Sequence, residues 1–193
     1  QKILEPVLQC VNGSTVPQLY AIGHAHLDVA WLWPLAETER KIARTLGNTL
    51  ALLEEYPEYR YIQSQPHLFW MLKELYPDLY VRVKQAISDG KVVADGGMWV
   101  EADTNISGGE ALIRQILYGK QWFQDEYGID SRILWLPDVF GYSGALPQIL
   151  VGCNMEGFFT QKITWIYNGG KPFPVTTFMW EGIEGSQILT HIF

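Results

Sequence analysis

The chain has 193 residues, of which 48% are hydrophobic and 18% are charged, enough apolar material for one globular domain. Its formal net charge of −7, with no basic patch, argues against a nucleic-acid partner. No apolar run approaches the roughly 18 residues of a membrane-spanning helix, and the N-terminal segment lacks a signal-peptide core, so we expect a cytoplasmic protein with no membrane partner. Cys10 and Cys153 have no C-x-x-C spacing and are expected to be buried.

Short apolar runs bounded by Gly, Pro, Asn or Asp alternate with amphipathic segments along the chain. The runs predict strands over residues 19–23, 59–63, 92–95, 133–136, 157–160, 176–180 and 187–193. Between the strands, apolar residues at intervals of three and four predict helices over 34–55, 68–75, 79–87, 107–127 and 145–150. In the helix over 107–127, Ser107 is the predicted N-cap and Glu110 completes a capping box.

The alternation of strand and helix is typical of right-handed crossovers around a parallel sheet. We therefore predict the α/β class, with a mostly parallel sheet, crossover helices and a single domain over residues 1–193. Beyond about residue 141 the later strands lack helical partners, and the Gly169-Gly170 pair predicts a long loop. Because the chain starts at Gln1 and stops inside a predicted strand, we expect it to be an incomplete piece of a longer protein.

Polar and aromatic side chains gather just beyond the carboxyl ends of the first four predicted strands, where the sites of parallel α/β proteins form. In chain order they are His24, His26, Asp28, Ser64, Gln65, His67, Trp99, Glu101, Asp103, Asp138, Phe140 and Tyr142. This grouping predicts a functional site on one rim of the sheet, although the loops of any α/β protein are rich in polar groups.

His26 and Asp28 are two residues apart, so in an extended segment their side chains project to the same face. Zinc accepts this mixture of imidazole nitrogen and carboxylate oxygen, whereas magnesium or calcium would require more oxygens. His24 shares the face and is a candidate third ligand or supporting partner. An H-x-D segment is common, so a hydrogen-bonded turn remains an alternative, as does a core or capping role for His24.

Asp138 follows an apolar strand in WLPDVFGYSGALPQIL and lies between Pro137 and Gly141, so its carboxylate is expected to point away from the sheet. Burial of this charge beside Trp135 and Phe140 would be unfavourable unless a cation such as zinc offset it. A cap on the following short helix is the alternative role. The aromatic rings that flank the polar groups could stack on sugar rings, although most tryptophans belong to cores.

Three stretches together carry a resemblance to a known family: GHAHLDVAWLWPLAET, ADGGMWVEADTNISGGEALIRQ and WLPDVFGYSGALPQIL. In this order they cover most of residues 19–161. With them the chain resembles the N-terminal catalytic α/β domain of the α-mannosidases of glycoside hydrolase family 38, in particular the cytosolic and bacterial branch. The resemblance implies that the chain is part of a seven-stranded (β/α) barrel-like catalytic domain.

The resemblance implies a retaining exo-α-mannosidase that removes terminal α-linked mannose from an oligosaccharide by zinc-assisted double displacement. One zinc ion would be bound by His26, Asp28 and Asp138, and Asp138 would also be the nucleophile. The resemblance implies that Trp31 forms the aromatic wall under the sugar ring and that Asp103 with its neighbours lines the pocket. Further candidates for contact with the sugar are Trp99, Glu101, Phe140 and Tyr142. Apart from the resemblance, His24 and His67 are candidates for a supporting position behind the ligands. A homo-oligomer is left open.

In the family, one further zinc-binding histidine and an aspartate that is the general acid lie far downstream of the nucleophile. This chain extends 55 residues beyond Asp138, and its later histidine, His191, lies in no stretch that matches that motif. We therefore expect the 193-residue chain by itself to bind zinc weakly or not at all and to have no turnover.

Two other functions are weighed against this one. A zinc-dependent deacetylase-like enzyme would carry an H-x-x-x-H pair on the helix after the second strand, where His67 is alone. A non-catalytic carbohydrate-binding module would need the aromatic residues but would have no use for Asp138.

Overall fold

The computed structural model describes residues 3–11, 13, 19–165 and 173–193. The strands in this part of the chain are β1 (Gly23–His24), β2 (Tyr61–Gln63), β3 (Val92–Ala94), β4 (Ile133–Leu136), β5 (Gly157–Thr160), β6 (Thr177–Glu181) and β7 (Gln187–Ile192). The helices are α1 (Glu5–Leu8), α2 (Leu35–Glu55), α3 (Pro66–Leu75), α4 (Pro77–Ser88), α5 (Gly109–Tyr127), α6 (Leu146–Gly152) and the 3-10 helix η1 (Lys162–Thr164). Each strand overlaps a predicted one.

The predicted parallel α/β arrangement is confirmed, with the strands divided between two sheets. The first sheet contains β1, β2 and β3, all parallel. The second has the order β4-β5-β7-β6, in which β4, β5 and β7 are parallel and β6 is antiparallel to β7. A short connection joins β6 to β7, and only antiparallel neighbours allow this. The backbone N–H of Trp135 donates to the carbonyl of Gly96 at 3.2 Å and links the two sheets.

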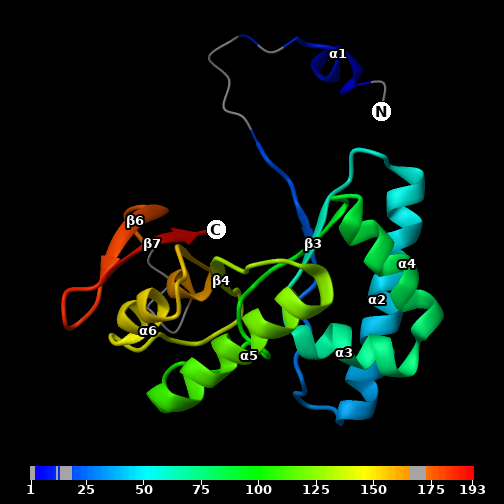
Figure 1. The fold of residues 1–193 in the computed structure, drawn as a ribbon. Helices are drawn as coiled ribbons and strands as arrows, with labels where there is room; N and C mark the ends of the chain where they lie inside the picture. Colours follow the sequence, from blue (N-terminus) through cyan, green and yellow to red (C-terminus); the bar gives the residue numbers. More distant parts are fainter. Residues whose placement is uncertain (1–2, 12, 14–18, 166–172) are drawn as a thin grey trace.

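Two hydrophobic cores lie behind the sheets. In Figure 1, α2, α3 and α4 gather on one side of β3, and their apolar faces form the first core around the fully buried Ile42 and Phe69. The second core joins α5 and α6 to β4 through Leu134 and Leu136. Because side chains alternate along a strand, Trp135 faces the opposite side of β4.

Several local predictions need correction. The N-cap of α5 is Gly108, and it makes no side-chain cap, so the predicted capping box with Ser107 does not form. The helix begins one residue too late for the Ser107 hydroxyl to serve as its cap. Helices α3 and α4 begin two residues earlier than predicted, because proline is favoured in the first turn.

The cysteines differ in exposure. Cys153 is buried as predicted, whereas Cys10 is exposed because the segment around α1 lies apart from the two cores (Figure 1). Most of the loop predicted around Gly169-Gly170 lies outside the described residues.

Candidate functional site

The loops that follow β1, β3, β4 and β5 surround a cavity of about 400 Å³. It is lined by Asp28, Trp31, Glu101, Asp103, Asp138, Val139, Phe140 and Lys162. Most of the side chains predicted to bind metal or sugar therefore meet in one place. Trp31 is 65% exposed, which leaves its ring available for stacking.

His26 is the centre of the polar contacts. Its Nδ1 lies 2.8 Å from Oε2 of Glu101, while its Nε2 lies 3.2 Å from Oδ1 of Asp28 and 3.6 Å from Oδ2 of Asp138. Ligand atoms of His26, Asp28 and Asp138 all lie within 4.8 Å of one another. With the Glu101 carboxylate beside Nδ1, the lone pair of an unprotonated Nε2 is available to the side of the other two carboxylates, an arrangement common to metal-binding imidazoles.

The surrounding charges change the proton affinity of this imidazole. Burial lowers the pKa of His26, but the hydrogen bonds and charges of Glu101 and Asp28 outweigh that effect and raise the pKa to about 9. Without a metal ion His26 is therefore cationic at neutral pH. A metal ion at Nε2 would have to displace that proton.

Asp28 is held in place from α2. The buried hydroxyl of Thr38 donates to the carbonyl of Asp28 at 2.9 Å and accepts the indole N–H of Trp33 at 2.9 Å. The loop between β1 and α2 is thus closed onto the helix, which fixes the backbone from which the Asp28 carboxylate projects.

Glu101 is fixed by buried polar side chains of the β2–α3 junction. The Ser64 hydroxyl donates to Oε1 of Glu101, and the backbone N–H of Glu101 donates to Oε1 of Gln65 at 3.1 Å. The amide of Gln65 also donates to the carbonyl of Leu27 at 2.9 Å, and Gln65 has a left-handed backbone with φ 62°. Such strain persists where surrounding contacts determine it, so Gln65 ties the loops after β1 and β3 together.

Asp138 is held by a lysine that the sequence reasoning missed. The ammonium of Lys162, in η1, forms an ion pair with Oδ1 of Asp138. It also lies 3.8 Å from the centroid of the Trp165 ring and 4.7 Å from that of Phe140. Lys162 follows β5, so extending the search for polar residues to the fifth predicted strand would have found it.

His24 lies beside this group, but both of its ring nitrogens have partners. Nδ1 is 3.0 Å from the carbonyl of Ile62, and the indole N–H of Trp135 donates to Nε2 at 3.3 Å. Because an indole N–H only donates, Nε2 accepts and Nδ1 carries the proton. Burial lowers the pKa of His24, consistent with a neutral ring. These contacts favour a supporting position over that of a third ligand.

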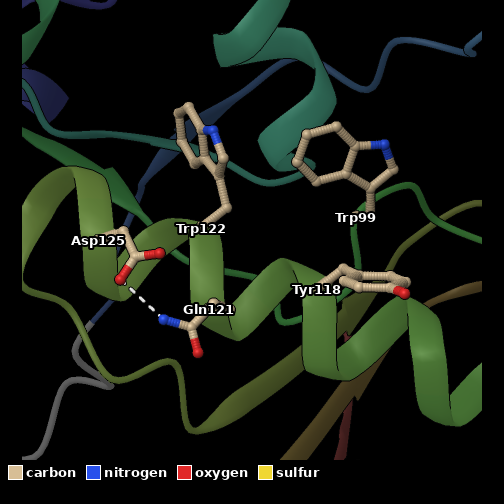
Figure 2. A pocket seen from close by; sticks show the side chains of 5 residues that line it. All are labelled: Trp99, Tyr118, Gln121, Trp122 and Asp125. Atoms are coloured by element: carbon tan, nitrogen blue, oxygen red, sulfur yellow. Dashed lines mark hydrogen bonds between the residues drawn. The ribbon is translucent and has the colours of Figure 1, made fainter.

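Trp99 lies away from the carboxylates. Figure 2 shows its ring beside a cavity of about 350 Å³, together with Tyr118, Gln121, Trp122 and Asp125 of α5. The backbone N–H of Trp99 donates to the carbonyl of Gln115 in α5 at 2.8 Å, which turns this segment toward the helix. Trp99 therefore does not line the cavity that contains Asp138.

Two further predicted residues also lie elsewhere. The ring of His67 stacks on Trp70 with centroids 5.3 Å apart, and burial lowers the pKa of His67. The hydroxyl of Tyr142 contacts Thr160, and the ring lines an apolar cavity against the second sheet. Their position after a strand was predicted, but the direction in which each side chain points depends on its packing against neighbouring elements.

The fold and the cavity define a parallel α/β domain with histidine and carboxylates at the strand ends. Residues 17–193 match the family profile described as the glycosyl hydrolases family 38 N-terminal domain. The chain therefore belongs to this family.

The similarity to individual proteins agrees with this assignment. The chain is 45% identical to the α-mannosidase of Saccharomyces cerevisiae over 94% of its length, and 45% identical to human α-mannosidase 2C1 over 93%. It spans 17% of each of those proteins. The crystal structure of an α-mannosidase from Enterococcus faecalis V583 has the same fold, with a TM-score of 0.77 at 24% identity, covering 89% of this chain and 19% of that one.

Two further observations concern the deacetylase-like alternative and membrane-spanning helices. The helix after β2, α3, contains one histidine, His67, so the pair expected of a deacetylase-like enzyme is absent there. Among the described residues, no helix is both long and apolar enough to span a bilayer.

Proposed function

We propose that the whole protein is a retaining exo-α-mannosidase that uses zinc, and that residues 1–193 form part of its catalytic domain. Family membership and the similarity to named α-mannosidases support the activity. The observation that carries the site is the contact of Glu101 with Nδ1 of His26, which directs Nε2 toward Asp28 and Asp138. An α-mannoside oligosaccharide substrate and a cytoplasmic location are predictions from the family resemblance, and a homo-oligomer stays open.

The donor set fits zinc. One imidazole and two carboxylates offer ligand atoms close together, and the carboxylate behind the imidazole is the support that zinc-binding histidines usually have. The residues that would hold the ion are His26, Asp28 and Asp138. When bound, zinc would supply a Lewis acid that grips hydroxyl oxygens of the sugar.

In the proposed reaction, a carboxylate oxygen of Asp138 attacks the anomeric carbon of mannose. The new carbon–oxygen bond forms as the glycosidic bond breaks, and the departing oxygen takes a proton from a general acid outside the described residues. Water then hydrolyses the glycosyl ester and restores Asp138. Trp31, exposed at the cavity, is placed to stack on the sugar ring.

The test compares the full-length parent with the 193-residue chain. Both are purified, their zinc content is measured, and hydrolysis of an aryl α-mannoside is followed. We expect turnover by the parent, loss of turnover after chelation and recovery with added zinc. The chain alone is expected to bind zinc weakly and to be inactive, because it has no residue matching the family's general acid. Turnover by the chain at the rate of the parent would overturn the second expectation, and a parent without turnover would overturn the first.

A further inference from the structure

Lys162 occupies an unusual environment for a lysine. The residue is 8% exposed, and its ammonium lies against a carboxylate and two aromatic rings. Lysine side chains normally keep the charged end in water. Here the ion pair and the attraction between a cation and the faces of Trp165 and Phe140 compensate for the lost hydration. The ammonium is therefore held in one place at the edge of the cavity.

The two oxygens of Asp138 have different surroundings as a result. Oδ1 pairs with Lys162 and is shielded from solvent. Oδ2 lies 3.6 Å from Nε2 of His26, within the group of atoms suited to a metal ion. A carboxylate can bind a metal through one oxygen or through both, and it can rotate between these arrangements. An ammonium fixed on Oδ1 removes that freedom.

We propose that Lys162 is a positioning residue that holds Oδ1 of Asp138 and so fixes the orientation of the carboxylate, with Oδ2 on the side of the proposed metal ligands. The inference rests on the proposed function, since it concerns the orientation of the proposed nucleophile. The fixed positive charge also repels a metal cation and competes for the carboxylate. Lys162 therefore favours the orientation of Asp138 that catalysis requires, but it lowers the affinity of the site for a metal ion.

If Lys162 has this role, one substitution should lower kcat without lowering the affinity for zinc. In the full-length parent, K162M keeps the length of the side chain and removes its charge. We expect kcat to fall by about 100-fold, the effect of a small misplacement of a reacting group, with little change in KM. The affinity for zinc, measured by competition with a chelator, should be equal to that of the wild type or higher.

K162R and K120M are the matched variants. Arginine keeps the charge opposite Asp138, so K162R should recover most of the lost kcat. Lys120 is also largely buried and pairs with an aspartate, Asp130, but lies outside the cavity, so K120M should keep wild-type kcat and zinc affinity. Melting temperatures are measured for every variant. If K162M does not fold, K162Q, which keeps a hydrogen-bond donor without the charge, takes its place.

Three results would each overturn the proposal: wild-type kcat in K162M, zinc affinity that falls together with kcat, or K162R no better than K162M. The second result would indicate a merely structural lysine. A wild-type parent that binds zinc without hydrolysing α-mannosides contradicts the proposed function alone. The zinc affinities of wild type, K162M and K162R would still test Lys162 in that case.

Discussion

The site has two groups of residues that are held in place by different interactions. The first group, His26, Asp28 and Glu101, comes from the loops of the first sheet. The second group, Asp138 and Lys162, comes from the loops of the second sheet. Directional hydrogen bonds to Thr38, Ser64 and Gln65 fix the first group. An ion pair and ring contacts fix the second.

The difference has a physical consequence. A hydrogen bond depends on direction as well as distance, whereas an ion pair acts through charge and is confined here by the rings around Lys162. The first group is therefore preformed by its own sheet. The orientation of Asp138 depends on charges on both sides of the cavity, namely Lys162 and the ligands across from it.

The largest effect is expected from D138N in the full-length parent. This substitution removes the negative charge of Asp138 with little change in side-chain volume. We expect kcat for an aryl α-mannoside to fall by about 10⁴-fold or more, because an amide is a poor nucleophile. Binding of mannose, measured by calorimetry, should persist. D125N on α5, outside the cavity, is the control. Unchanged hydrolysis in D138N would exclude Asp138 as the nucleophile.

E101Q tests whether the first group is preformed through the support behind His26. The substitution removes the negative charge opposite Nδ1, and we expect zinc affinity of the parent to fall about 10- to 100-fold. Competition with a chelator measures this, and E110Q, on the exposed face of α5, should leave the affinity unchanged. Equal zinc affinities in E101Q and wild type would show that Glu101 does not support the ligand.

T38V tests the hydrogen bonds that close the loop of Asp28 onto α2. Valine leaves the Asp28 carbonyl and the Trp33 indole without their partner, and we expect the free energy of unfolding to fall by about 1–3 kcal/mol. Urea unfolding of the chain measures it. T49V is the comparison variant, because the buried Thr49 hydroxyl donates to the Thr45 carbonyl of the same helix and contacts Tyr61 but closes no loop onto α2. A cost in T38V no larger than in T49V would contradict the role of Thr38.

E126Q probes the helices behind the first sheet, away from the cavity, through the pH dependence of stability. Oε2 of Glu126 lies 2.6 Å from Lys73 of α3, and Oε1 lies 2.8 Å from Lys84 of α4. Burial raises the pKa of Glu126, but the two lysines outweigh it and lower the pKa from 4.5 to about 2. Since the folded pKa is the lower one, this carboxylate stabilises the fold above pH 4.5, and the contribution is lost as the pH falls toward 2.

The measurement is urea unfolding of wild type and E126Q at a series of pH values. We expect E126Q to be less stable than wild type near pH 7, with the difference shrinking below pH 4.5. A difference that stays constant down to pH 2 would mean that Glu126 does not act through its charge.

Much of the fold was predictable because its signals are local. The alternation of strands and helices predicted a segment that overlaps each described strand, although β1 shares only Gly23 with its predicted range, helix α1 was not predicted and the N-cap at Ser107 was wrong. The rule that sites form at the carboxyl ends of parallel strands also brought His26, Asp28 and Asp138 together. It could not decide that Trp99 and Tyr142 turn into other cavities, since packing against α5 and the second sheet decides that.

By itself the sequence determined the fold class, the family resemblance and the residues that follow each strand, because periodicity and motifs are carried by neighbours along the chain. Only the tertiary structure decided that Glu101 lies behind His26, that the nitrogens of His24 are occupied, and that Lys162 pairs with Asp138. These contacts join residues that are up to 111 positions apart. They depend on how the two sheets meet, which no local pattern encodes.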